Sequence, residues 1–266
     1  MPACWRYERM RPEDLAEAVN SRPIAWLPIG PLEWHGEAVS FGCDPVYAAA
    51  VTERAWSLAG GVLMPTLYVG IETLFRGGNM EGFIDHWALE NTSGEHHPGS
   101  VFCRSVTLEL LMRDYLYFLQ REGFKLCVLV SGHGGWEHLD VLSDLEDRWR
   151  NMPMRFLVWK GPESLCPEDL RFDGAGGHAD FSEASVLGAI DPALVCSEKF
   201  GIARRDRAIG LKQENSSRID YEKGRRLLEW EAGQMAAEIG KILNALLENG
   251  TERLDRTKAT RKWYLR

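Results

Sequence analysis

The stretch Trp26–Asp44, WLPIGPLEWHGEAVSFGCD, combines a strand with the first group of chemically active side chains. Its apolar start belongs to the run 24–29, which predicts a buried strand that ends at Gly30 and Pro31. In a parallel-type α/β sheet, ligands bind beyond the carboxyl ends of the strands. The polar loop that follows therefore lies where a site would form, and it carries Glu33, His35, Glu37 and Asp44.

Carboxylate and imidazole groups at this spacing are a donor set suited to zinc or manganese. Two structural alternatives remain open: solvated loop residues, or, for Asp44, the N-cap of a helix that begins at Pro45. Cys43 could be a nucleophile, but no nearby histidine is expected to activate its thiol. We therefore expect Cys43 to pack as a small apolar residue.

Composition narrows the class of protein. The 266 residues are 45% apolar and 26% charged, which is ordinary for a globular chain with a substantial core. A net charge of -8 argues against nucleic-acid binding. Six scattered cysteines without a CxxC pair, a charged N-terminus and the lack of a membrane-length apolar run predict a cytoplasmic protein without membrane contact.

Strand and helix patterns alternate along the chain. Helical spacing is found at 12–20, 46–59, 100–122, 136–151, 183–190 and 221–247, and strand patterns at 24–29, 62–69, 125–130 and 155–159. This alternation predicts one α/β domain over residues 1–266. The segment 70–97 breaks the pattern, and we expect it to form either a lid over the site or an oligomer contact.

Two further loops carry histidines. Strand 125–130 runs into Ser131-Gly132-His133-Gly134-Gly135, where glycines let the backbone approach a neighbour closely. The loop before helix 183–190 carries His178, and Glu183 begins that helix. His138, in helix 136–151, is expected either at the surface or in support of His133.

The motifs in these loops resemble the creatininase (creatinine amidohydrolase) family over nearly the whole chain. They are Leu27-Pro-Ile-Gly, Glu33-Trp-His35-Gly, Gly42-Cys-Asp44, His97-Pro-Gly-Ser, Ser131-Gly-His133-Gly-Gly and His178-Ala…Glu183-Ala-Ser185. The resemblance implies a three-layer α/β/α sandwich with a mostly parallel sheet, two divalent metal ions per chain (zinc, manganese or iron), and a homo-oligomer, often a hexamer.

The resemblance also implies a role for each residue. Glu33 and His133 would bind one metal and His35 the other, with Asp44 bridging both. His178 would move a proton to the departing nitrogen, and Glu183 would be a further ligand or a proton carrier.

Two departures from the family pattern affect these expectations. Creatinine-hydrolysing members carry a metal-binding Glu where this chain has Gly135, so Glu183, or less readily Glu137, would complete the second site. The family's Gly-Glu after His-Ala is here Asp180-Phe181, which changes the pocket wall.

We therefore expect a metal-dependent hydrolase that cleaves a C–N bond in a small cyclic amide, a formamide or a peptide-like compound, and not creatinine itself. The alternative is a metal-poor binding or regulatory protein on the same fold without turnover.

Overall fold

Two strands, apolar except for Ser131 at the end of the second, form the centre of the sheet. In the computed structural model, which describes residues 4–71, 100–162, 166–175, 178–200 and 213–248, β2 (Ile24–Ile29) pairs in parallel with β4 (Leu126–Ser131) from Ile24↔Leu126 to Ile29↔Ser131. The other strands are β1 (Cys4–Arg6), β3 (Gly61–Leu63) and β5 (Arg155–Trp159). All pairings are parallel, in the order β1-β3-β2-β4-β5.

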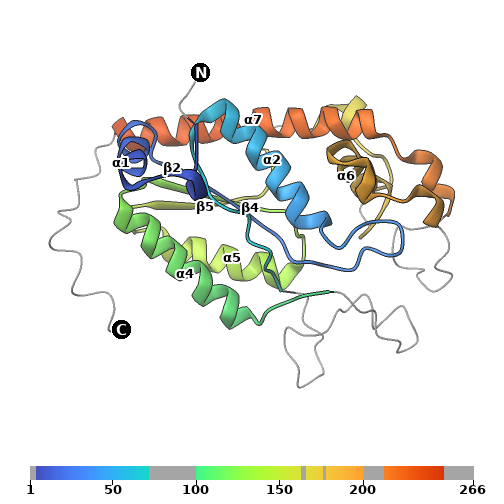
Figure 1. Ribbon diagram of the computed structural model, residues 1–266, viewed down its shortest axis with the longest axis horizontal. Helices are drawn as coiled ribbons and strands as arrows, with labels where there is room; N and C mark the ends of the chain where they lie inside the picture. The colour runs from blue at the N-terminus through green and yellow to red at the C-terminus, as the bar shows by residue number, and fades with distance from the viewer. Residues whose placement is uncertain (1–3, 72–99, 163–165, 176–177, 201–212, 249–266) are drawn as a thin grey trace.

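Helices cover both faces of this sheet (Figure 1). Alternate residues of β2 and β4 pack toward α1 (Pro12–Ser21), α4 (Ser105–Glu122) and α5 (Trp136–Trp149) on one face. The other face packs against α2 (Cys43–Ala59) and α7 (Tyr221–Glu248), with α6 (Phe181–Ile190) lying against both helices. Strands buried on both faces explain the continuous apolar runs, and the predicted three-layer α/β/α sandwich is confirmed.

Some predicted elements differ in extent. β3 ends at Leu63, well short of residue 69, because Pro65 lacks a backbone donor and Leu67 makes only an isolated bridge to Ile29. The edge strand β1 was not predicted, since three half-exposed residues carry too short a pattern. Most of the segment 70–97 lies outside the described residues. No helix in the described ranges is long and apolar enough to cross a membrane.

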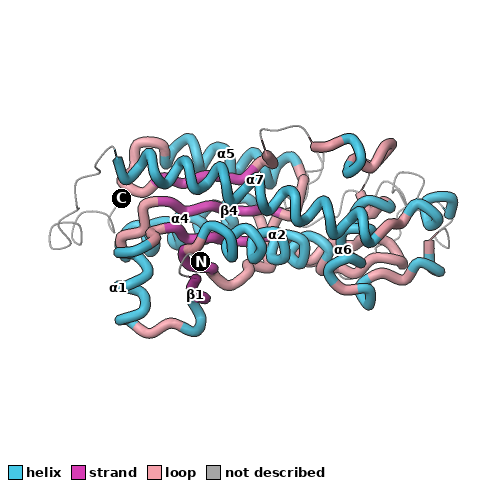
Figure 2. Tube along the Cα trace, turned by 90° about the horizontal axis from the view of Figure 1, so that it is seen from above, coloured by secondary structure: helices cyan, strands magenta, loops and turns pink. Residues whose placement is uncertain are grey.

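The carboxyl ends of β2 and β4 meet the start of α2 at one edge of the sheet, where the loops gather near α6 (Figure 2). Glycines allow this close approach. A Cβ on Gly30 would lie 2.7 Å from the nitrogen of Pro45, and one on Gly132 would overlap the carbonyl oxygen of Asp44. The backbone at this edge is therefore packed too closely to admit side chains at these two positions.

We predict that Gly132→Ala destabilises the fold by about 1–3 kcal/mol, because the added methyl group must displace the first turn of α2. Gly134→Ala is the matched control, since a Cβ there has no heavy atom within 4 Å among the described residues. The free energy of unfolding in urea measures both changes. Equal stabilities of the two variants would contradict this account of the packing.

Candidate metal centre

Charged side chains from separate loops are buried together at this edge. Glu33 and His35 follow β2, Asp44 lies in the first turn of α2, and His133 follows β4. Their exposed fractions are only 2%, 1%, 3% and 7%, respectively. Burying charge is costly unless it is paired or binds a metal. The alternative of solvated loop residues is therefore wrong for Glu33, His35 and Asp44, but it holds for Glu37, which is exposed.

Glu33, Asp44 and His133 form the first group that could hold a metal ion. His133 Nδ1 lies 3.0 Å from Asp44 Oδ2 and 3.1 Å from Glu33 Oε2. The other ring nitrogen, Nε2, lies 3.1 Å from the carbonyl oxygen of Ile71, to which it can only donate. In the neutral ring this bond leaves the Nδ1 lone pair facing two carboxylates, the arrangement typical of a metal-binding histidine.

His35 lies in a second group, with Cys43 and Glu183. Its Nδ1 donates to the carbonyl oxygen of Glu33 at 3.0 Å. Its Nε2 is buried and has no hydrogen-bond partner within the described part of the chain, although Asp44 Oδ1 and Glu183 Oε2 lie 3.4 and 3.7 Å away. An orphaned, inward-facing nitrogen near carboxylate oxygens fits a metal site.

Asp44 lies between the two groups, with Oδ2 toward His133 and Oδ1 toward His35. It is the second residue of α2, whose N-cap is Gly42, and no side chain caps the helix there. The N-cap alternative for Asp44 is therefore wrong. Its carboxylate is placed where it could bridge two cations.

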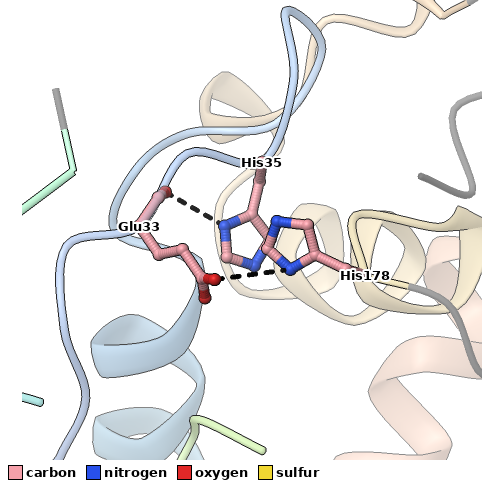
Figure 3. Close-up of side chains that lie close together, drawn as sticks. All are labelled: Glu33, His35 and His178. Carbon is pink, nitrogen blue, oxygen red and sulfur yellow. Dashed lines mark hydrogen bonds and ion pairs between the residues drawn. The ribbon is translucent and has the colours of Figure 1, made fainter. Parts of the chain in front are cut away.

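His178 approaches the cluster from the loop before α6. Its Nε2 donates to the carbonyl oxygen of Trp34 at 2.6 Å, while its Nδ1 lies 3.8 Å from Glu33 Oε1. Figure 3 shows the imidazole beside that of His35, and the two ring centroids are 4.1 Å apart. Glu33, His35 and His178 form a third group within metal-ligand range, so distance alone does not separate a ligand from a proton carrier.

A strained turn brings Glu183 to the site. Ala179 adopts a left-handed conformation (φ 57°), and its backbone N–H donates to Glu183 Oε2. Asp180 caps α6 by accepting from the backbone N–H groups of Ser182 and Glu183. Of the two carboxylates left open by the sequence, the described structure groups Glu183 with His35, whereas Glu137 belongs to none of the three groups.

His138 is fully buried behind His133, so the surface alternative is wrong. Its Nδ1 accepts from the backbone N–H of Ile71 at 3.4 Å, and its Nε2 lies 3.1 Å from Ser131 Oγ. That hydroxyl contacts both the backbone N–H and the carbonyl oxygen of His133. His138 therefore helps to fix the backbone of His133, an arrangement that the sequence suggested only as an alternative.

The electrostatics follow from burial and these contacts. Burial alone would lower the pKa of His35 and of His133. Cys43 and Asp44 instead raise the pKa of His35 well above its ordinary value. Glu33 and Asp44 do the same for the pKa of His133. Despite burial, the histidines hold the pKa of Asp44 low. Burial lowers the pKa of His138 to about 3, so this ring is neutral.

The packing role predicted for Cys43 is confirmed, because the residue lies in a buried apolar cluster, but the expectation that no histidine lies near it is wrong. It is buried as expected, but its Sγ lies within 4.8 Å of a His35 ring nitrogen and a Glu183 carboxylate oxygen. No local sequence signal pairs residue 43 with residue 183, because the contact depends on α6 packing against the start of α2.

The comparisons with known proteins agree with this fold. The family model described as creatinine amidohydrolase (Creatininase) matches residues 8–250. A creatininase crystal structure is 19% identical, covering 90% of this chain and 98% of that chain, with a TM-score of 0.69. One described as creatininase Mn is 20% identical (90% and 98%; TM-score 0.68). A mutant creatininase of the Zn-Zn type is 21% identical (89% and 97%; TM-score 0.63). No curated protein sequence matches significantly.

We predict that metal binding weakens as the pH falls. Because the pKa values of His35 and His133 are raised in the metal-free chain, both rings hold protons through neutral pH that a cation must displace. Calorimetric zinc titrations at pH 6 and pH 8, in buffers of different ionisation enthalpy, should show proton release and tighter binding at the higher pH. A zinc affinity that does not change with pH, without proton release, would contradict the assignment of His35 and His133 as metal ligands.

Proposed function

Since the chain belongs to the creatininase family, we propose that it is a metal-dependent amidohydrolase that cleaves a C–N bond in a small cyclic amide, a formamide or a peptide-like compound. The observation that carries the proposal is the position of Asp44, whose two carboxylate oxygens face the inward nitrogens of His133 and His35. Such a carboxylate is suited to hold two divalent cations side by side.

We propose that Glu33, His133 and Asp44, which form one group, hold one ion. His35 and Glu183, which lie together in another group, hold the other, and Asp44, whose Oδ1 lies 3.4 Å from His35 Nε2, is shared between the two ions. Two divalent ions, when bound, supply a Lewis acid for the substrate carbonyl and activate a water molecule near neutral pH. The protein's contribution is to fix the donors. Each histidine is oriented by a bond from its other nitrogen to a backbone carbonyl, that of Ile71 or of Glu33.

His178 is the residue that we propose moves a proton to the departing nitrogen. Its bond to Trp34 fixes Nε2 as the donor, which leaves Nδ1 directed toward Glu33 and able to accept and return a proton. The carboxylate of Glu183 lies 3.7 Å from His35 Nε2, and burial raises its pKa. It could share this proton if it is not held by a cation.

The departures in sequence support a substrate other than creatinine. In this structure a Cβ at Gly135 would overlap His133 Nε2, so a side chain there would have to displace the His133 ring. Phe181 is buried beneath Arg218, whose guanidinium carbon lies 3.8 Å from the ring centroid, and Asp180 is used as a helix cap. Positions 135, 180 and 181 therefore present different groups from those of the creatinine-hydrolysing pattern.

The identity of the metal, the location of the protein and its oligomeric state are further parts of this proposal. Similar creatininase structures are described as manganese and Zn-Zn forms, which supports one of the first-row ions zinc, manganese or iron for this chain. We also propose a cytoplasmic homo-oligomer, with a hexamer as the first state to test by light scattering.

We predict that the purified chain retains about two divalent ions, and that His133→Ala and His35→Ala each lose at least one. His133→Ala should also abolish amidase activity toward a panel of lactams, cyclic ureides, formamides and short peptides. Elemental analysis measures the metal content, with Asp140→Asn on the exposed part of α5 as the control. One ion or none in the wild type, with no hydrolysis, would favour the metal-poor binding protein instead.

We predict that His178→Gln separates metal binding from proton transfer. The amide can still donate to the carbonyl of Trp34 but cannot carry a proton, so kcat should fall by about 10²- to 10⁴-fold while both ions remain bound. Loss of an ion in this variant would show instead that His178 is a ligand, as its distance to Glu33 and His35 would also allow.

A further inference from the structure

The second metal group contains a sulfur atom that the proposed function does not use. Cys43 is the first residue of α2, is 5% exposed and is in no disulfide with another described residue. Its Sγ, one nitrogen of His35 and one carboxylate oxygen of Glu183 all lie within 4.8 Å of one another. Neighbouring apolar side chains bury the rest of the residue, including Trp34, Ala179 and Ala184.

The orphaned nitrogen of His35 is the independent sign that a ligand belongs here. Nε2 is buried, has no hydrogen-bond partner in the described structure, and faces oxygens at 3.4 and 3.7 Å. Ligand atoms bound tetrahedrally at about 2.0–2.3 Å lie roughly 3.3–3.8 Å from one another. The distances from His35 Nε2 to the nearest oxygens of Asp44 and Glu183 fall in this range.

A further donor is needed to complete this group. His35 Nε2 and Glu183 Oε2 supply two, Asp44 Oδ1 faces His35 Nε2 from the first group, and the glycine loop supplies none because Gly134 and Gly135 carry no side chain. Cys43 is the remaining side chain that the described groups place beside His35 and Glu183. Burial raises the pKa of the Cys43 thiol to about 12, so it is a neutral thiol in the metal-free chain, and a bound cation would displace its proton.

We propose that Cys43 is a thiolate ligand of the second metal ion, together with His35, Asp44 and Glu183. On binding, the thiol gives its proton to solvent and the sulfur forms a bond to the metal, with no change in oxidation state. This inference rests on the proposed dinuclear site, and it gives the two metal positions different donor atoms. The first group offers only hard oxygen and imidazole donors, whereas sulfur makes the second selective for zinc, cobalt or iron(II) over manganese.

The test is X-ray absorption at the zinc edge on the full chain loaded with two equivalents of zinc. Wild-type protein should show a sulfur shell at about 2.3 Å, which averages to about half a sulfur per zinc because one site of the two contains it. Cys43→Ala should lose this shell, bind zinc at the second site at least about 100-fold more weakly, and keep the first ion.

Cys127→Ala is the matched control, since Cys127 is equally buried but lies in the core strand β4 and in none of the metal groups. It should keep the sulfur shell and both ions. Two bound ions without sulfur scattering in the wild type would overturn the role of Cys43 and leave the proposed function standing, whether or not Cys43→Ala folds. A sulfur shell that survives in Cys43→Ala would also overturn it. A chain that binds no zinc would overturn both proposals.

Discussion

Inward-facing imidazole nitrogens held against buried carboxylates are the interaction on which the site depends. His133 Nδ1 lies 3.0–3.1 Å from oxygens of Asp44 and Glu33, and His35 Nε2 lies 3.4 Å from the other oxygen of Asp44. Two lone pairs at such distances repel each other, so a positive charge must lie between them. In the metal-free chain that charge is a proton, and the donor set fits a divalent cation in its place.

The fold accounts for this arrangement. Parallel pairing of β2 with β4 puts the loops of Glu33 and His133 at one edge of the sheet, and Gly30 and Gly132 let the start of α2 bring Asp44 between them. The backbone carbonyl oxygens of Glu33 and Ile71 then fix the orientations of the His35 and His133 rings. Stability and chemistry are therefore coupled at this edge, because the contacts that position the donors also join the central strands to α2.

The sequence predicted the central part of this structure well. The apolar runs at β2 and β4 and the helical spacing of α2 and α7 are strong patterns, because each element is buried on a whole face or along a long stripe. The loops with Glu33, His35, Asp44, His133 and His178 were found because they follow strands or precede helices. Their roles as ligands and proton carrier stay predictions.

Other features depend on contacts that no local pattern encodes. β1 is too short to show periodicity, and the burial of His138 depends on Ile71 and Ser131 meeting around it. Cys43 was predicted as a packing residue because nothing nearby in the sequence indicates that His35 turns toward it or that α6 brings Glu183 beside it. Long-range packing decides these positions.

The most direct measurement of the central claim is the anomalous diffraction of a metal-loaded crystal, recorded on both sides of the zinc absorption edge. The account predicts two anomalous peaks about 3.5–4 Å apart, one on each side of the Asp44 carboxylate, the first against His133 and the second against His35. A single peak, or peaks away from Asp44, would contradict it.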